Sequence, residues 1–151
     1  MATFFERVTK DIGDAMKARN TTDLGTLRML KAALMNKEVE KGRALDEAES
    51  LQVVSSLVKQ RRDSIEQFRA GGRAELADKE QAEIAVLERY QPPAADEAAL
   101  AAAIEAAITE TGATSPKEMG KVIAAAKAKL SGLTVDGKAL SDAVKNRLTA
   151  R

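Results

Sequence analysis

A run of basic side chains beside a double glycine is the part of this sequence whose residue types could do chemistry. Lys59, Arg61 and Arg62 fall within about one helical turn, and Arg73 directly follows two glycines. Glycines adopt positive φ angles easily, and such a turn can leave backbone amides free to point at an anion. The pattern predicts a site for a phosphate or for the acidic surface of a partner. The alternative is a solvated helix face that ends in a glycine cap.

Two other spacings carry weaker chemical signals. Ser56 and Lys59 match the Ser-x-x-Lys pattern in which a lysine helps to activate a serine, but the Ser-Asp-Asn and Lys-Thr-Gly motifs that accompany it are missing. Glu80 and Glu83 lie one turn apart and could bind a hard cation, although a surface pair of glutamates is far commoner. We therefore predict no catalytic residue and no metal site.

The composition excludes most familiar active sites. The 151 residues include no histidine and no cysteine, which removes the usual general base, the thiol nucleophile, disulfides and the common zinc ligands. No Walker or dinucleotide glycine pattern is present. The N-terminus becomes charged too early for a signal peptide, and no uncharged apolar run approaches the length of a membrane span. We expect a cytoplasmic protein with no cofactor and no membrane contact.

The apolar residues predict an all-α fold. Hydrophobic residues make up 44% of the chain but aromatic residues only 3%, so the core must be built from aliphatic side chains and alanine. Helical spacing predicts one helix that ends near residues 19–20 and a second that is capped by Thr22 or Asp23 and stops near 41–42. A third helix is expected over 46–69 and a fourth over 74–89.

Two features interrupt this helical pattern. The apolar stripe of the third helix is broken at Arg61 and Arg62, so that turn should leave the core or meet a carboxylate. Consecutive prolines at 92 and 93 force extended backbone and remove two amide donors, which indicates a boundary. We expect an N-terminal helical bundle over 1–90, a proline linker over 91–93 and a smaller three-helix module over 94–151.

The module after the prolines has clear helix boundaries. Nine of the fourteen residues from 94 to 107 are alanine, and Gly112 should end that helix. Ser115, followed by proline and then by Glu118, predicts a capping box at the start of the next helix, which Gly132 stops. A last helix follows Asp136.

Charge is unevenly distributed although the chain is only +1 overall. Residues 1–93 hold 16 basic and 16 acidic side chains, whereas residues 111–151 hold eight basic against three acidic ones, locally +5. A basic helical end is compatible with nucleic acid, and the alternative is a charge that serves solubility alone. With three Phe, one Tyr and no Trp, any RNA contact should be electrostatic rather than by base stacking. The candidate nucleic-acid contacts are Lys59, Arg61, Arg62, Arg73, Lys117, Lys121, Lys127, Lys129, Lys138 and Lys145.

Short motifs spread over nearly the whole chain resemble one known family. They are LRMLKAAL at 27–34, VKQR at 58–61 with Ser64 and Phe68, Gly72-Arg73 with Leu76, Glu80, Glu83 and Leu87, Tyr90 with Pro92, and MGKV at 119–122 with Gly132 and Gly137. In this order they resemble the YqeY family, stand-alone relatives of the C-terminal tail of the GatB subunit of tRNA-dependent amidotransferase. This chain departs from the family pattern after Gly132, where 133–135 read Leu-Thr-Val and supply no basic residue.

The resemblance implies an all-helical, two-part protein and a link to tRNA. The related GatB tail is thought to engage tRNA, whereas amide transfer belongs to domains absent here. The resemblance therefore implies a non-catalytic accessory protein that binds tRNA or a tRNA-linked enzyme, such as the amidotransferase or an aminoacyl-tRNA synthetase. Two alternatives remain. One is a component of the amidotransferase that carries its label of carbon–nitrogen ligase with glutamine as amide donor, and the other is a protein-interaction adaptor without RNA affinity.

Overall fold

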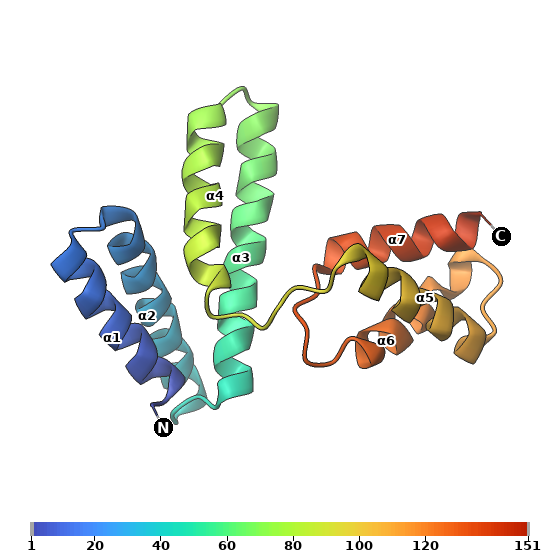
Figure 1. Ribbon diagram of the computed structural model, residues 1–151, viewed down its shortest axis with the longest axis horizontal. Helices are drawn as coiled ribbons and strands as arrows, with labels where there is room; N and C mark the ends of the chain where they lie inside the picture. The colour runs from blue at the N-terminus through green and yellow to red at the C-terminus, as the bar shows by residue number, and fades with distance from the viewer. Residues whose placement is uncertain (1, 151) are drawn as a thin grey trace. The chain divides into compact units, whose positions relative to one another are not determined.

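The computed structural model describes residues 2–150, which fold into helices (Figure 1). In chain order they are α1 Phe4–Ala18, α2 Thr21–Lys41, α3 Glu47–Ala70, α4 Ala74–Glu88, α5 Glu97–Thr111, the 3-10 turn η1 Pro116–Glu118, α6 Met119–Lys129 and α7 Gly137–Thr149. The all-α prediction is confirmed. Met1 and Arg151, which belong to the predicted domains and in the case of Arg151 to the local +5, lie outside the described residues.

The chain divides into two compact units, Met1–Gln91 and Pro92–Arg151. In the first unit α1 packs on α2 and α3 packs on α4, and α2 also contacts α3 and α4 (Figure 1). The core of this unit joins aliphatic side chains from all four helices, among them Val8, Leu30, Leu34, Val54 and Ile84. Each helix turns its apolar stripe toward this core, as the helical spacing of the sequence requires.

Polar caps fix where the first helices begin. The third helix begins one residue after its predicted start, because Asp46 is its N-cap and Glu49 closes the capping box in return. The predicted cap of α2 at Thr22 or Asp23 is wrong, because the Asn20 side chain accepts the Asp23 amide at 3.0 Å. Arg19 ends α1 in the left-handed conformation, with φ 55°. Only Arg19 and Asn20 join α1 to α2. Asparagine is as good an N-cap as aspartate, and it lies one turn before the first apolar residue of α2.

Arg61 is a buried cation in the first unit. Its residue is only 6% exposed, and its Nε lies 3.0 Å from Oε2 of Glu83 and 3.8 Å from Oε2 of Glu80. One terminal nitrogen donates to the Leu57 carbonyl at 3.2 Å and the other contacts the sulfur of Met29 at 2.9 Å. The break in the apolar stripe therefore meets carboxylates, which is one of the two outcomes expected for this turn, and Arg61 joins α3 to α4 and α2.

The end of α4 is anchored to α1 and α2 by side chains. The Tyr90 hydroxyl donates to Asp11, and the Tyr90 ring lies 5.5 Å from the ring of Phe4 between centroids. Arg89 forms an ion pair with Asp23 of α2, with 2.8 Å between its Nη1 and the Asp23 Oδ2. Burial, reinforced by the hydrogen bond to Asp11, raises the pKa of the Tyr90 hydroxyl. These contacts close the bundle at the residues just before the prolines.

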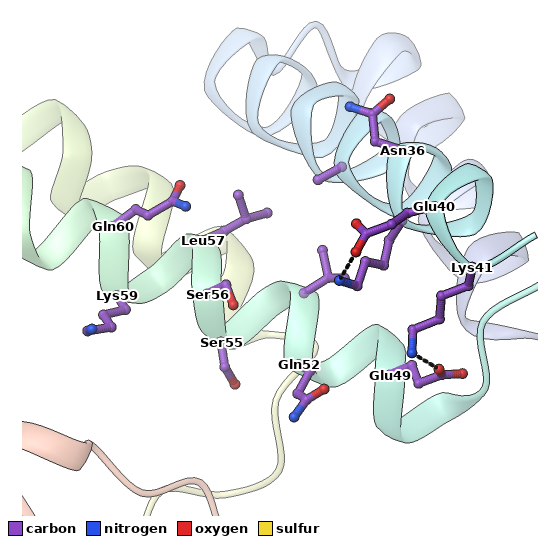
Figure 2. A pocket seen from close by; sticks show the side chains of 13 residues that line it. Asn36, Glu40, Lys41, Glu49, Gln52, Ser55, Ser56, Leu57, Lys59 and Gln60 are labelled. Atoms are coloured by element: carbon purple, nitrogen blue, oxygen red, sulfur yellow. Dashed lines mark hydrogen bonds and ion pairs between the residues drawn. The ribbon is translucent and has the colours of Figure 1, made fainter.

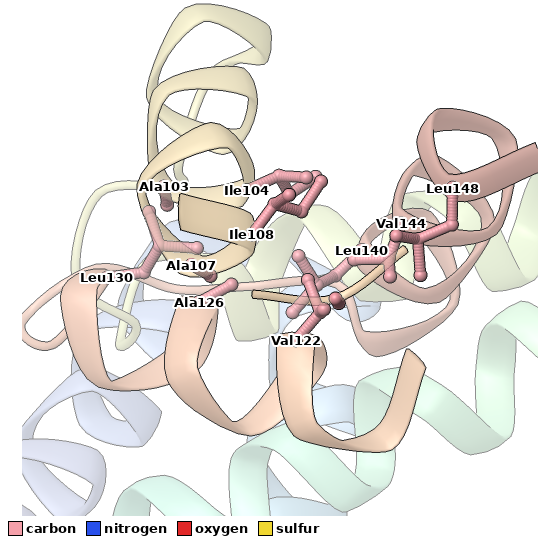
Figure 3. Packing of buried hydrophobic residues seen from close by; sticks show 11 residues of the cluster. Ala103, Ile104, Ala107, Ile108, Val122, Ala126, Leu130, Leu140, Val144 and Leu148 are labelled. Atoms are coloured by element: carbon pink, nitrogen blue, oxygen red, sulfur yellow. The ribbon is translucent and has the colours of Figure 1, made fainter. Parts of the chain in front are cut away.

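The second unit is a three-helix module around its own aliphatic core (Figure 3). Figure 3 shows Ile104 and Ile108 of α5 lying close to Val122 of α6 and to Leu140 and Val144 of α7. The capping box at Ser115 is present, although the first turn after it is the 3-10 turn η1 and α6 begins three residues later than the proline. Gly112 caps α5 in the left-handed conformation, and Asp136 caps α7 by accepting the Lys138 amide, as expected.

The prolines belong to the second unit. Thr134 donates its hydroxyl to the Pro92 carbonyl at 2.6 Å and its amide to the Pro93 carbonyl at 2.9 Å, and its own carbonyl accepts the Ala95 amide at 2.9 Å. Proline lacks an amide donor but keeps its acceptor, so this loop pairs with the prolines through the only backbone group they offer. The segment expected as a separate linker is therefore tied to the loop before α7.

We predict that Arg61→Leu destabilises the protein far more than the neighbouring change Arg62→Leu. Loss of Arg61 leaves Glu83 partly buried without its cation, and breaking such a pair costs about 2–4 kcal/mol, whereas an exposed change stays within about 0.5 kcal/mol. Urea unfolding measures the difference. Adding Glu83→Leu to Arg61→Leu should recover most of the loss, and equal effects of the two single variants would contradict the role given to Arg61.

We predict that Tyr90 titrates at a more alkaline pH than a free tyrosine, whose pKa is about 10. It is the only tyrosine of the chain, so its ultraviolet absorbance on forming phenolate is unambiguous. Because the folded pKa lies above the unfolded one, this contact stabilises the fold below about pH 10 and its contribution is lost as the pH rises further. Asp11→Asn should lower the midpoint, and an unchanged midpoint in that variant would show that Asp11 plays no part.

Candidate nucleic-acid interface

The glycine turn expected to hold an anion is already satisfied by the backbone. The amides of Gly71, Gly72 and Arg73 donate to the carbonyls of residues 67, 69 and 68 at 3.0, 3.1 and 2.7 Å. Gly72 alone takes a positive φ, 73°, so these bonds form a Schellman cap of α3. The prediction that the turn leaves its amides free is wrong, and the alternative, a glycine cap at a helix end, is correct.

The four basic residues predicted around this turn have different surroundings. Arg61 is withdrawn from solvent by Glu83 and Glu80, so we correct its assignment as a phosphate contact. Arg73 is exposed and lies 3.5 Å from Glu75, while Arg62 is exposed on the solvent side of α3. Lys59 lines the groove described next. The structure thus does not gather these cations into one anion site.

A groove with a volume of about 570 Å³ runs between α2 and α3 (Figure 2). Its lining combines Val53 and Leu57 with polar side chains such as Gln52, Ser56 and Lys59 (Figure 2). Ser56 and Lys59, which match the Ser-x-x-Lys spacing, therefore lie on the same groove, but no hydrogen bond joins them among residues 2–150. The lining of the groove therefore combines apolar side chains with amide and hydroxyl groups.

Ion pairs occupy most of the charges along this groove. Lys37 pairs with Glu40 at 3.1 Å, and Lys41 pairs with Glu49 at 2.8 Å. Hydrogen bonds from Arg43 and then Lys41 hold the pKa of the Glu49 carboxyl well below its usual range. A carboxylate held in this way is a poor proton acceptor near neutral pH. The groove is therefore suited to binding rather than to acid–base chemistry.

The local +5 of residues 111–151 is not a +5 surface once the second unit is folded. Helix α5 packs on α6 and α7 and carries carboxylates without any basic residue. Glu105 pairs with Arg147 of α7, and Glu110 pairs with Lys129 of α6 at 2.7 Å. The sequence from 92 to 151 contains eight basic and seven acidic residues, a net charge of +1. Packing thus brings the acidic helix α5 beside the basic helices, so that its carboxylates offset part of their positive charge.

Five of the six predicted lysines of this unit remain exposed outside those α5 pairs. Lys117, Lys127 and Lys145 make no ion pair with another described residue. Lys121 interacts electrostatically with Glu118. Lys138, which also has an interaction partner, lies seven positions before Lys145 and so on the same side of α7. Lys127 and Lys129 are two positions apart, or about 200° around α6, so they do not share one face.

The start of α6 is occupied by a carboxylate of the chain itself. Glu118 accepts the amides of Thr114 and Ser115 at 2.7 and 3.3 Å. The hydrogen bond from the Thr114 amide lowers the pKa of the Glu118 carboxyl. An external phosphate would have to displace this group, so any anion is expected at the lysines and not at the helix end.

Sequence reasoning missed an exposed apolar face on α2. Met35 is 49% exposed and Val39 is 82% exposed, and Met29 on the same helix is 37% exposed. The signal was available, because these residues fall outside the stripe of Leu27, Leu30 and Leu34 that the core uses. Such side chains are candidates for contact with another protein.

Residues 2–150 contain neither a membrane-spanning helix nor a cluster of metal ligands. Among residues 2–150, no helix combines the length and the apolar character needed to cross a membrane. Within the same residues, no group of three or more Asp and Glu side chains is placed to hold a metal ion.

Comparison with known proteins identifies relatives over most of the chain. A protein called altered inheritance of mitochondria protein 41, mitochondrial, from Lachancea thermotolerans is 36% identical over 110 residues, which cover 71% of this chain and 59% of that protein. The protein of the same name from Eremothecium gossypii is 36% identical over 108 residues, covering 70% and 59%. The matched region therefore spans less than two thirds of these relatives.

The family model described as Yqey-like protein matches residues 5–148, and so includes helices of both units. This match confirms the resemblance indicated by the motifs at 27–34, 58–61 and 119–122. The helical fold, the order of the motifs and the family match agree, and the chain belongs to the YqeY family.

Proposed function

We propose that this protein is a non-catalytic accessory factor that binds tRNA through the second unit. The observation that carries the proposal is the set of exposed lysines on η1, α6 and α7 that α5 does not neutralise. They are Lys117, Lys121, Lys127 and Lys145. Lysines on a helical surface bind phosphates without reading sequence, which suits a folded RNA recognised by its shape.

The second unit has no aromatic side chain, so its binding to RNA should be electrostatic. All three Phe residues and the single Tyr precede the prolines, so the second unit has no aromatic side chain on which a base could stack. Affinity must then come from phosphate contacts, and it should fall steeply with added salt. The unit as a whole is only +1, so binding should be weak at physiological ionic strength and should favour an RNA already held by a partner.

The groove between α2 and α3 supports a second candidate, association with a tRNA-linked enzyme. A groove that combines apolar and polar side chains is typical of a surface that contacts protein. The partner in this case is a tRNA-dependent amidotransferase or an aminoacyl-tRNA synthetase, as the resemblance to the GatB tail suggests. An adaptor that uses only this groove, without RNA, is the corresponding alternative.

The compartment is also a proposal. We propose that the protein is cytoplasmic, whereas the names of the two relatives described above contain the word mitochondrial. Because the match spans less than two thirds of those proteins, their compartment and activity are not assigned to this chain.

We predict that Lys121→Gln combined with Lys145→Gln weakens tRNA binding and makes it less dependent on salt. Two lost phosphate contacts should reduce the slope of log affinity against log salt by about 1.5. Fluorescence anisotropy of labelled tRNA over a salt series measures both quantities for the full chain.

The matched control is Lys17→Gln combined with Lys79→Gln. Both lysines are exposed in the first unit, and the double variant has the same net charge as the test variant. It should bind tRNA nearly as the unchanged protein does. If the control loses as much affinity, or if Lys59→Gln with Arg62→Gln loses more, the site is not on α6 and α7.

We predict that the purified protein neither releases ammonia from glutamine nor amidates a misacylated tRNA. The sequence contains no histidine to act as a general base and no cysteine to act as a nucleophile. Among the described residues, no general base is hydrogen-bonded to the Ser56 hydroxyl. A coupled ammonia assay tests the first point and mass analysis of the aminoacyl group tests the second. Turnover that Ser56→Ala abolishes would overturn the non-catalytic assignment.

A further inference from the structure

Helix α2 carries a second seam on the side away from the core. Arg28, Ala32, Met35 and Val39 are spaced by four, three and four positions, and all are exposed. Spacings of three and four are the a and d pattern with which one helix packs along another. The core uses a different stripe of the same helix, built on Leu27, Leu30 and Leu34. No described residue of this chain covers the outer seam.

The side chains of this seam are unusual for a free surface. Val39 is 82% exposed, and Met35, one turn away, is 49% exposed. The methyl group of Ala32 continues the strip toward Arg28, whose aliphatic stem can cover an apolar neighbour while the guanidinium stays in water. An apolar strip of this kind, sustained over about two turns of one helix from Ala32 to Val39, indicates a contact surface.

The charged residues beside the seam indicate which charges a partner must carry. Lys31 and Glu38 are seven positions apart on the same flank, so they are about 10 Å apart along the helix and too far to pair with each other. The Lys31 ammonium lies 5.4 Å from the centroid of the Phe5 ring. Neither Lys31 nor Glu38 forms an ion pair with another described side chain. The occupant must therefore present an acidic and a basic group, two turns apart, in the reverse order.

We propose that α2 pairs in antiparallel orientation with α2 of a second copy of this chain. A two-fold axis near residues 33 and 34 sets Ala32 against the partner's Met35 and Arg28 against the partner's Val39. The same register places Lys31 beside the partner's Glu38, and Glu38 beside the partner's Lys31. An antiparallel pair of α2 helices is therefore complementary in charge. One symmetric contact pairs Lys31 of each copy with Glu38 of the other.

The size of the contact defines the strength of the pairing. The 21 residues of α2 make a helix about 31 Å long, and a single helix pair buries less than the roughly 800 Å² per partner of a standard stable interface. The dimer should therefore be weak and should form only as concentration rises.

Charge exchange between the two flanking residues tests the register directly. Lys31→Glu creates two acidic pairs in a dimer and Glu38→Lys creates two basic pairs, so each variant alone should dissociate at least about tenfold more readily than the unchanged chain. Mixing the two variants should restore pairing, because each heterodimer contact then joins an acid to a base. The double variant Lys31→Glu with Glu38→Lys should also dimerise. Sedimentation equilibrium of the full chain from micromolar to millimolar concentration measures all four samples.

Two controls separate pairing from folding. Val39→Glu changes a residue that is mostly in solvent, so it should keep its helical circular dichroism and melting temperature but lose self-association. Lys79→Glu makes the same charge change as Lys31→Glu on the exposed side of α4 and should dimerise normally. A monomer at every concentration, or a mixture of Lys31→Glu and Glu38→Lys that stays monomeric while the unchanged chain dimerises, would overturn the proposal.

Discussion

A charged guanidinium inside an aliphatic bundle must have its charge matched, and this requirement governs the first unit. Arg61 sits in the middle of α3, so its carboxylate partners have to come from a helix that runs alongside. The carboxylates of Glu80 and Glu83 meet this need only if α4 folds back on α3 in one register. Aliphatic side chains alone would tolerate several registers, whereas an unmatched buried charge would not. The polar contact thus selects the pairing that the apolar contacts then stabilise.

The second unit matches its charges differently. Here the cations stay at the surface, and an acidic helix neutralises part of them through exposed pairs at Arg147 and Lys129. Such pairs contribute little to stability, because solvent screens them. Their effect is on the surface instead, since they leave some lysines available and remove others. The same number of positive charges can therefore give a strong or a weak electrostatic surface, depending on which acidic helix packs beside it.

Helix existence could be predicted from this sequence, whereas the environment of single polar residues could not. Periodicity located the helices to within a few residues, and the Gly112 and Asp136 boundaries agree with their caps. The Asn20 cap was missed because Thr22 and Asp23 compete with it within one turn. The glycine turn before Arg73 was misjudged because sequence does not reveal where amides donate. Charge counted along the chain likewise missed the pairing of α5 with distant cations, which only tertiary packing creates.

The position of Tyr90 has a practical consequence for following this protein in solution. With no tryptophan in the chain, Tyr90 is its only strong intrinsic fluorophore, and all aromatic residues precede the prolines. Near-ultraviolet signals therefore report on the four-helix unit alone, while far-ultraviolet circular dichroism sums the helices of both. The hydrogen bond to Asp11 should also quench the emission of the folded state, because a carboxylate is an efficient acceptor of the excited phenol proton. The chain thus carries an intrinsic near-ultraviolet label on the first unit and none on the second.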